Sequence, residues 1–251
     1  MTTEALPFIF FFIALFYSSV GFGGGSSYLA ILSLFLTDFY EIRSTALILN
    51  ICVVTIGTLA FIRYRVFNFK LFWPFLVSSI PMAYLGAQLK LSQQVFFLIL
   101  GGLLVLSGGF MLLRYMKSRL KSKEFKLSSK LSLGGSIGFL AGLSGIGGGI
   151  FLAPALNLLQ WANPRTVACL ASVFILVNSV AGLAGLFVAG TIEFDGDLII
   201  KLIIAVVLGG ILGSYLSNHK FNLRLIGILT AVLVVYVGIR LLLLHGFGVR
   251  V

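Results

Sequence analysis

Two runs of glycine, each bordered by serine and embedded in apolar sequence, are the residues best suited to chemistry in this chain. The first reads GFGGG over residues 21–25 and precedes Ser26 and Ser27, and the second reads GIGGG over residues 145–149 and follows Ser144. A glycine costs a helix about 1 kcal/mol relative to alanine, so each run should interrupt its helix. The helix that restarts after a break offers unpaired N–H groups and the positive end of its dipole, which suit a small anion. Close helix packing is the alternative explanation.

Three polar side chains inside apolar stretches could complete such a site. Asn50 and Ser172 hold equivalent positions, each seven residues after an arginine, and Asn178 lies further along the second stretch. Polar groups deep in a membrane helix rarely face lipid, so we expect them to face a cavity; interhelical hydrogen bonding is the alternative. The serine hydroxyls could donate to an oxyanion or cap the backbone instead. The candidate substrate-binding residues are Gly21, Gly23, Gly24, Gly25, Ser26, Ser27, Asn50, Ser144, Gly145, Gly147, Gly148, Gly149, Ser172 and Asn178.

Two arginines, Arg43 and Arg165, open equivalent helices in the two halves of the chain. We expect them at opposite mouths of the protein, where each could attract or gate an anion on its way to the glycine runs. An ordinary anchor at the membrane interface is the alternative role.

The composition indicates what kind of fold must position these residues. The chain has 251 residues, of which 59% are hydrophobic and 10% charged, with a mean hydropathy of +1.12. Globular domains have about 45–50% apolar and 25% charged residues, so we expect an all-α polytopic membrane protein. Apolar stretches of about 20 residues exclude an outer-membrane barrel. The first residues have no basic region, so we expect no signal peptide.

The positive charge of the chain is concentrated in one segment. The net charge is +11, and seven of the 18 Lys and Arg residues lie between Arg114 and Lys130. A bias of positive charge toward the cytoplasm explains this cluster better than nucleic-acid binding does. We therefore expect a cytoplasmic linker at residues 117–130 in a multi-pass protein of the plasma membrane, which is the inner membrane if the source is bacterial.

The second half of the chain repeats the first, with landmarks recurring at offsets between 122 and 129 residues. Such duplication is typical of transporters. We assign residues 1–116 to the first repeat and 131–251 to the second. Each contains a broken helix, at 6–36 and 131–159, followed by three spans.

The number of crossings decides how the halves are oriented. If each broken helix crosses the membrane once, the halves are parallel; if it forms a re-entrant hairpin, they are inverted. Counting positive charges does not separate the two topologies. The pieces after the glycines span only about 18 Å against a hydrocarbon core of about 30 Å, which favours hairpins and inverted repeats.

The paired G-x-G-G-G signatures, each near the start of a half, resemble the TauE/SafE family of membrane transporters over the whole chain. In the second half Pro154 follows Gly145 by nine residues, whereas Ala30 stands at the corresponding place in the first half. The pairs Ala171-Ser172 and Asn178-Ser179 and the later Gly182 also resemble the family. The resemblance implies an exporter of sulfite or of organic sulfur anions such as sulfoacetate.

We therefore expect a secondary transporter or facilitator of small anions, with a channel on the same scaffold as an alternative. An intramembrane serine protease is a remote alternative, because Gly142-Leu143-Ser144-Gly145 needs a nearby histidine. His219 and His245 lie at the borders of spans, and Cys52 and Cys169 read as small buried hydrophobes. The expected partners are a small anion and the bilayer, with no nucleic acid, cofactor or metal. No acid falls in a predicted span; the seven are Glu4, Asp38, Glu41, Glu124, Glu193, Asp195 and Asp197.

Overall fold

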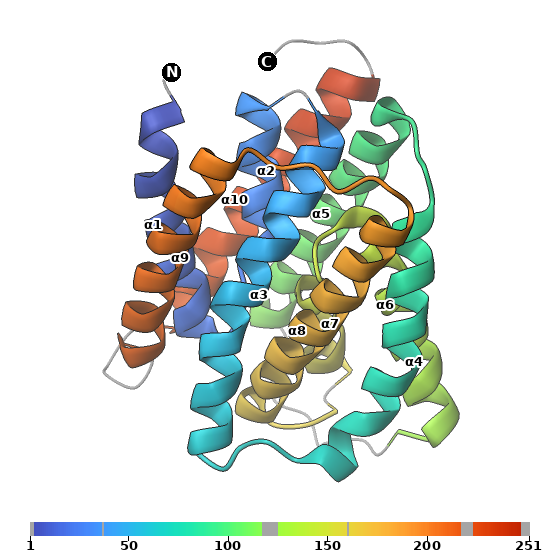
Figure 1. Ribbon diagram of the computed structural model, residues 1–251. Coiled ribbons are helices and arrows are strands. Elements are labelled where there is room, and N and C mark those ends of the chain that lie inside the picture. Colours follow the sequence, from blue (N-terminus) through green and yellow to red (C-terminus); the bar gives the residue numbers. More distant parts are fainter. Residues whose placement is uncertain (1–2, 37, 117–124, 160, 217–222, 247–251) are drawn as a thin grey trace.

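The computed structural model of the protein is all-helical (Figure 1) and describes residues 3–36, 38–116, 125–159, 161–216 and 223–246. The described residues form ten α-helices after a short 3-10 turn at Thr3–Ala5. The helices are α1 (Leu6–Val20), α2 (Gly25–Phe35), α3 (Phe39–Arg63), α4 (Phe69–Gln88), α5 (Gln93–Met116), α6 (Leu127–Ser144), α7 (Gly149–Leu158), α8 (Pro164–Val188), α9 (Gly196–Leu216) and α10 (Leu223–Gly246).

The six expected spans correspond to α3, α4, α5, α8, α9 and α10, and both expected breaks fall between helices. One boundary differs, because α6 begins at Leu127 and its first turn takes up residues assigned to the linker. Residues 117–124 of that linker lie outside the described part of the chain.

Several helices suit a membrane by length and composition. Among the described residues, three are long and apolar enough to cross one: α3, the Arg165–Val188 part of α8, and α9, with mean hydropathies between 2.2 and 2.3. Shorter apolar helices cover Leu6–Ser19, Gly25–Phe35 and Gln94–Phe110. Large apolar side chains such as Phe187, 75% exposed, point outward, which water would penalise and lipid would not.

Polar residues at the helix ends fix where the spans begin. Asp38 accepts hydrogen bonds from the backbone N–H groups of Tyr40 at 2.7 Å and Glu41 at 3.4 Å, and so caps α3. The side chain of Asn163 does the same for α8, accepting from the Thr166 N–H at 2.8 Å. A side-chain oxygen at this position satisfies an N–H group that has no partner within the helix.

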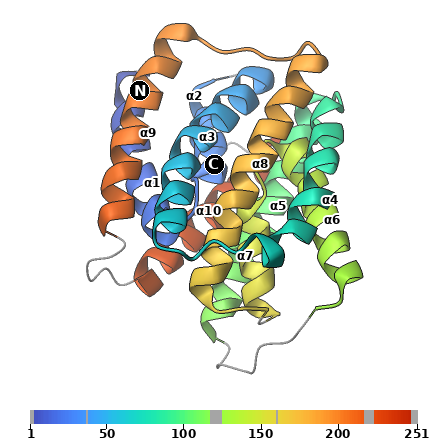
Figure 2. The same ribbon diagram turned by 60° about the horizontal axis from the view of Figure 1, so that its bottom comes forward.

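Helices of the first half of the chain pack mainly on helices of the second half. The broken helix of the first half packs through α1 on α9 of the second, and the broken helix of the second half packs through α6 on α4 of the first. Figure 2 shows these pairs at opposite edges of the bundle. At the centre α3 packs on α8, and α5 packs on α10. Each of these four contacts joins a helix that precedes residues 117–124 to a helix that follows them.

Glycines spaced four residues apart allow α6 to touch α4 and α9 to touch α1. A Cβ on Gly138 of α6 would lie 2.6 Å from Ser79 Cα in α4, and one on Gly142 would overlap the carbonyl of Ala83. On the other side, Gly209 and Gly213 of α9 meet the backbone of α1 in the same way. The four-residue spacing of small residues thus brings backbones together.

The chain directions can be followed in Figure 1. Helix α1 starts at the upper end of the bundle and α2 returns toward it, whereas α6 starts at the lower end and α7 returns toward that end. Helix α3 descends and α8 rises.

Candidate functional site

The first glycine run ends one helix and starts another. Gly21 closes α1 in the left-handed conformation, with φ at 86°, and its N–H donates to the Ser18 carbonyl at 3.1 Å. The Phe22 N–H donates to the Tyr17 carbonyl at 2.9 Å, which completes a glycine cap. Gly24 is also left-handed, with φ at 87°, and α2 begins at the next residue. Side chains disfavour this backbone region, so glycine is needed at both positions.

The second run breaks the chain in a similar way but with one more left-handed residue. Gly145 closes α6 with φ at 74°, and its N–H donates to the Ala141 carbonyl at 2.9 Å. Gly147 and Gly148 follow with φ at 82° and 84°, and α7 begins at Gly149. The first N–H groups of α2 and α7 have no partner within their own helices.

Asn50 of α3 joins the two breaks. Its Nδ2 donates to the Ile146 carbonyl in the second run at 3.0 Å. A Cβ on Gly23 in the first run would lie 2.5 Å from Asn50 Oδ1, and one on Gly25 would overlap the amide. A Cβ on Gly147 would lie 3.3 Å from Asn50 Nδ2. The two breaks therefore lie on either side of one fully buried amide.

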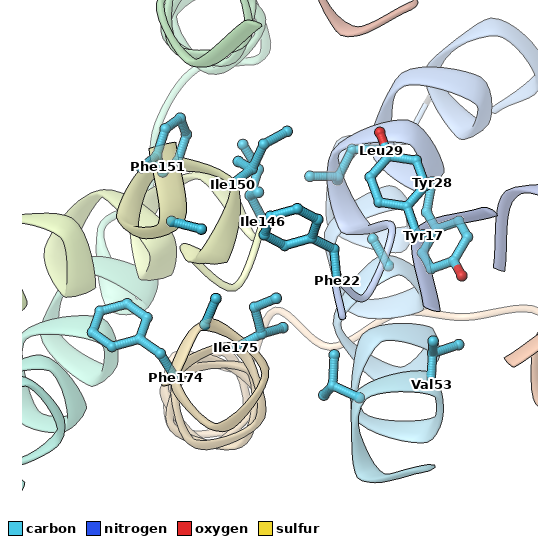
Figure 3. Close-up of a cluster of buried hydrophobic side chains, with 14 of the residues drawn as sticks. Tyr17, Phe22, Tyr28, Leu29, Val53, Ile146, Ile150, Phe151, Phe174 and Ile175 are labelled. Atoms are coloured by element: carbon cyan, nitrogen blue, oxygen red, sulfur yellow. The ribbon is translucent and has the colours of Figure 1, made fainter. Parts of the chain in front are cut away.

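Apolar side chains fill the space beside this amide. Figure 3 shows the ring of Phe22 next to Ile146, so that the second residues of the two runs meet. Ile175 of α8 and Val53 of α3 lie below them in this view, and all four are buried. In this conformation the side chains of Phe22 and Ile146 close the space between the two runs.

The other predicted site residues fall into two groups, according to whether their polar atoms already have hydrogen-bond partners in the protein. Ser27 bonds the Tyr17 hydroxyl at 2.6 Å, and Ser144 donates to the Leu140 carbonyl of its own helix at 2.6 Å. Ser172 lies 3.1 Å from the Thr58 hydroxyl and so joins α8 to α3. By contrast Ser26 Oγ and both amide atoms of Asn178 have no hydrogen-bond partner, although these residues are 2% and 1% exposed.

The two arginines occupy different environments. Arg43 is fully buried, and its Nη2 donates to the Gly142 carbonyl at 3.0 Å and the Ala87 carbonyl at 3.4 Å, near the ends of α6 and α4. Its guanidinium carbon lies 5.6 Å from the centroid of the Phe96 ring. It is therefore inside the bundle rather than at an open mouth, because its guanidinium reaches backbone carbonyls of α4 and α6. Arg165 is exposed, 6.0 Å from the Tyr64 ring centroid.

An acidic cluster lies near the start of α3. The Glu193 N–H, in the segment between α8 and α9, donates to Ser44 Oγ at 3.3 Å. Hydrogen bonding with Asp38 and the negative charge of Asp38 raise the pKa of the exposed Glu193 carboxyl, with a smaller effect from Glu41. The Glu193–Ser44 hydrogen bond tethers the α8–α9 connection to the start of α3, the helix that carries Arg43.

Sequence reasoning missed Ser179 as a site residue. It is fully buried, its hydroxyl has no partner, and a Cβ on Gly147 would lie 2.8 Å from its Oγ. The pair Asn178-Ser179 drew attention to this turn of α8, but only the fold places Ser179 against the second glycine run.

Comparison with known sequences settles the family. Residues 6–241 match the family described as "Sulfite exporter TauE/SafE". The chain belongs to the TauE/SafE family. This confirms the resemblance carried by the glycine signatures, and it identifies a multi-pass membrane transporter rather than an enzyme.

Two curated relatives support the assignment. This TauE/SafE protein is 35% identical over 195 residues to "Probable membrane transporter protein y4hK" of Sinorhizobium fredii (strain NBRC 101917 / NGR234), covering 74% of this chain and 77% of the relative. It is 24% identical over 218 residues to "Probable membrane transporter protein YunE" of Bacillus subtilis (strain 168), covering 79% of each chain. No solved structure matches at a significant level.

Proposed function

We propose that this TauE/SafE protein is a secondary transporter or facilitator of small anions, with sulfite, sulfonates and related organosulfur compounds as its substrates. The observation that carries the proposal is the meeting of the two glycine runs at Asn50, where the starts of α2 and α7 converge on one buried point. Each helix start contributes free N–H groups and about half a positive charge from its dipole. Together they offer an anion hydrogen bonds without a bulky cation in the pathway.

Unsatisfied polar atoms around the breaks support binding rather than packing alone. Ser26 and Asn178 are almost fully buried and have no partner, and leaving a buried polar group unpaired costs about 1–3 kcal/mol. Such groups are expected where a ligand completes their hydrogen bonds. Ser27, Ser144 and Ser172 have protein partners, and we assign them to holding the breaks in place.

We infer that the halves are inverted repeats and that α1 with α2, and α6 with α7, form re-entrant hairpins. The opposite directions of α3 and α8 and the exchange of α1 and α6 between halves support this topology. Alternating access would then rock the group formed by α1, α3 and α9 against the group formed by α4, α6 and α8. Phe22 and Ile146 would separate to admit the substrate.

Arg43 supplies the fixed positive charge nearest to the site in this proposal. A Cβ on Gly145 would lie 3.4 Å from Arg43 Cγ, so the guanidinium stem borders the second glycine run. Among the described residues it is the charged side chain that is fully buried. Buried ionisable groups in membrane proteins mark ion pathways. Arg165 would attract anions from the exposed end of α8, and the linker at 117–130 would face the cytoplasm.

Flux into liposomes tests the proposal. The purified protein, reconstituted without other proteins, should carry at least one of sulfite, sulfoacetate, sulfate and chloride, at a rate that saturates with concentration. Protein-free liposomes and a competition assay with unlabelled substrate are the controls. A rate that rises linearly with driving force would instead favour a channel on the same scaffold. No flux above the protein-free background across the panel would refute anion transport.

A further inference from the structure

The amide of Asn50 has a fixed orientation that restricts which anions can bind beside it. Its Nδ2 donates to the Ile146 carbonyl at 3.0 Å, and a carbonyl can only accept, so the nitrogen must face that group. The remaining atom, Oδ1, points toward Gly23, where a Cβ would lie 2.5 Å away. Asn50 is fully buried, and its Oδ1 has no hydrogen-bond partner.

The opposite kind of group faces the second glycine run. Ser179 Oγ has no partner, and it would lie 2.8 Å from a Cβ on Gly147, the residue whose Cβ would also lie 3.3 Å from Asn50 Nδ2. A free hydroxyl can donate, as can the first N–H groups of α7. The α7 side of the site therefore offers donors, whereas the α2 side adds the unpaired acceptor Asn50 Oδ1 to the N–H groups at the start of α2.

From this asymmetry we propose that the transported anion carries a hydrogen-bond donor of its own, an O–H or an N–H, in addition to its negatively charged group. The charged group binds the start of α7 and the Ser179 hydroxyl, while the donor satisfies Asn50 Oδ1. This inference rests on the proposed anion transport and narrows its substrate class. A fully ionised oxyanion has only acceptors and would leave Oδ1 unpaired and repelled.

The distribution of titratable side chains indicates how a proton could cross the membrane with the substrate. The buried or half-buried titratable side chains on α1, α2, α3, α7 and α8 are Tyr17, Tyr28, Tyr40, Glu41, Arg43, Cys52 and Cys169. Glu41 is the carboxylic acid in this set, and it lies in the first turn of α3, more than two turns before Asn50; carboxylic acids and histidines are the groups that usually relay protons in transporters. When the substrate is a hydrogen oxyanion such as hydrogensulfite, its proton crosses the membrane with it.

Two sulfonates of equal size test the requirement directly. 2-Hydroxyethanesulfonate and propane-1-sulfonate differ by a hydroxyl in place of a methyl group. The wild-type protein in liposomes should carry the hydroxyl compound with a kcat/KM at least about tenfold higher, because a site built to bond a hydroxyl rejects the analogue without one. Equal rates for the two would overturn the donor requirement while leaving anion transport intact.

Variants assign the preference to its residues. Asn50→Leu should bring the ratio of the two rates to about one, whereas Ser179→Ala should slow both compounds alike, since both carry the sulfonate. Thr55→Val is the matched control on α3, because the Thr55 hydroxyl bonds the Ile51 carbonyl of its own helix at 2.6 Å; it should keep the wild-type ratio. A ratio that persists in Asn50→Leu would overturn the role of Asn50, and the wild-type comparison stands even if that variant does not fold.

Sulfite provides an independent measurement. At constant total sulfite, with no pH difference across the membrane, the initial rate should follow the concentration of hydrogensulfite and rise as the pH falls through its ionisation near neutrality. Protein-free liposomes correct for permeation of dissolved sulfur dioxide. A rate that follows the sulfite dianion would contradict the proposal, and no flux of sulfite or either sulfonate would refute it together with the proposed function.

Discussion

At the scale of single residues, the site depends on backbone positions that only glycine occupies without strain. Gly145, Gly147 and Gly148 all have φ above +70°, and at Gly147 and Gly148 neighbouring side chains also fill the space where a Cβ would stand. The buried polar residues Asn50 and Arg43 then bond backbone carbonyls at or near the second break. Small changes at these positions should therefore affect transport more than their size suggests.

Gly147→Ala should reduce transport at least about tenfold. Its φ of 82° is strained for alanine by about 1–2 kcal/mol, and the new Cβ would meet Ile175 and Ser179 at 2.8 Å. Gly102→Ala in α5 is the control, since nothing lies within 4 Å of its Cβ position and alanine favours the helix. Initial rates in liposomes and thermal unfolding in detergent measure both effects. Normal transport by Gly147→Ala would contradict the need for this backbone conformation.

Arg43→Met should lower the maximal rate at least about tenfold and destabilise the protein by about 1–3 kcal/mol, because the carbonyls of Gly142 and Ala87 lose their donor. Arg43→Lys keeps the charge but loses the guanidinium geometry, so it should recover only part of the rate. Lys201→Met, at an exposed position on α9, is the charge-matched control and should behave like wild type. Recovery of the full rate by Arg43→Met would show that its positive charge has no part in transport.

At the scale of helices, the fold rests on close backbone contact between halves. Gly134, Gly138 and Gly142 of α6 face α4, and Gly209 and Gly213 of α9 face α1. Inside a bilayer, lipid chains are as apolar as a neighbouring helix, so the hydrophobic effect does little to hold two helices together. Close packing at these glycines is therefore the main source of stability between α6 and α4 and between α9 and α1.

Gly138→Leu should separate α6 from α4 and lower the unfolding temperature. A Cβ at this position would lie 2.6 Å from the Ser79 backbone, and overpacking of this kind costs about 1–3 kcal/mol. Gly135→Ala on the same helix is the control, because its Cβ would lie 3.7 Å from Met82, an ordinary contact. Fluorescence-monitored unfolding of the two variants compares them, and equal unfolding temperatures would argue against tight α4–α6 packing.

Local sequence predicted the helices and the breaks because their causes are local. Long apolar stretches set the spans, and glycines that can adopt positive φ set the breaks at Gly21 and Gly145. The partners of Asn50 and the burial of Arg43 depend on residues about a hundred positions away, and no local pattern encodes them. Ser179 was missed for the same reason, since its unpaired hydroxyl is a property of the packed bundle.

At the scale of the whole molecule, the proposed inverted topology predicts which connections between helices lie on which face of the membrane. The loop with Glu193 joins α8 to α9, and Lys126 immediately precedes α6. With re-entrant hairpins these two positions lie on opposite faces, whereas eight full crossings would put them on the same face.

Glu193→Cys and Lys126→Cys, each in a background with Cys52→Ala and Cys169→Ala, should differ in labelling by a membrane-impermeant thiol reagent on intact cells. Both positions are exposed, so accessibility is decided by the membrane alone. The thiol introduced in Glu193→Cys should react from outside, and the thiol introduced in Lys126→Cys should react only after permeabilisation. Labelling of both from the same side would refute the inverted topology.

The exchange of α1 and α6 between the halves also constrains how the protein is made. Helix α1 emerges from the ribosome first, but the surface that it rests on, α9, is synthesised near the end of the chain. Until then the face of α1 that packs on Gly209 and Gly213 of α9 has only lipid, an insertase or a chaperone to cover it. The helices before residues 117–124 and those after them therefore depend on each other to complete this packing.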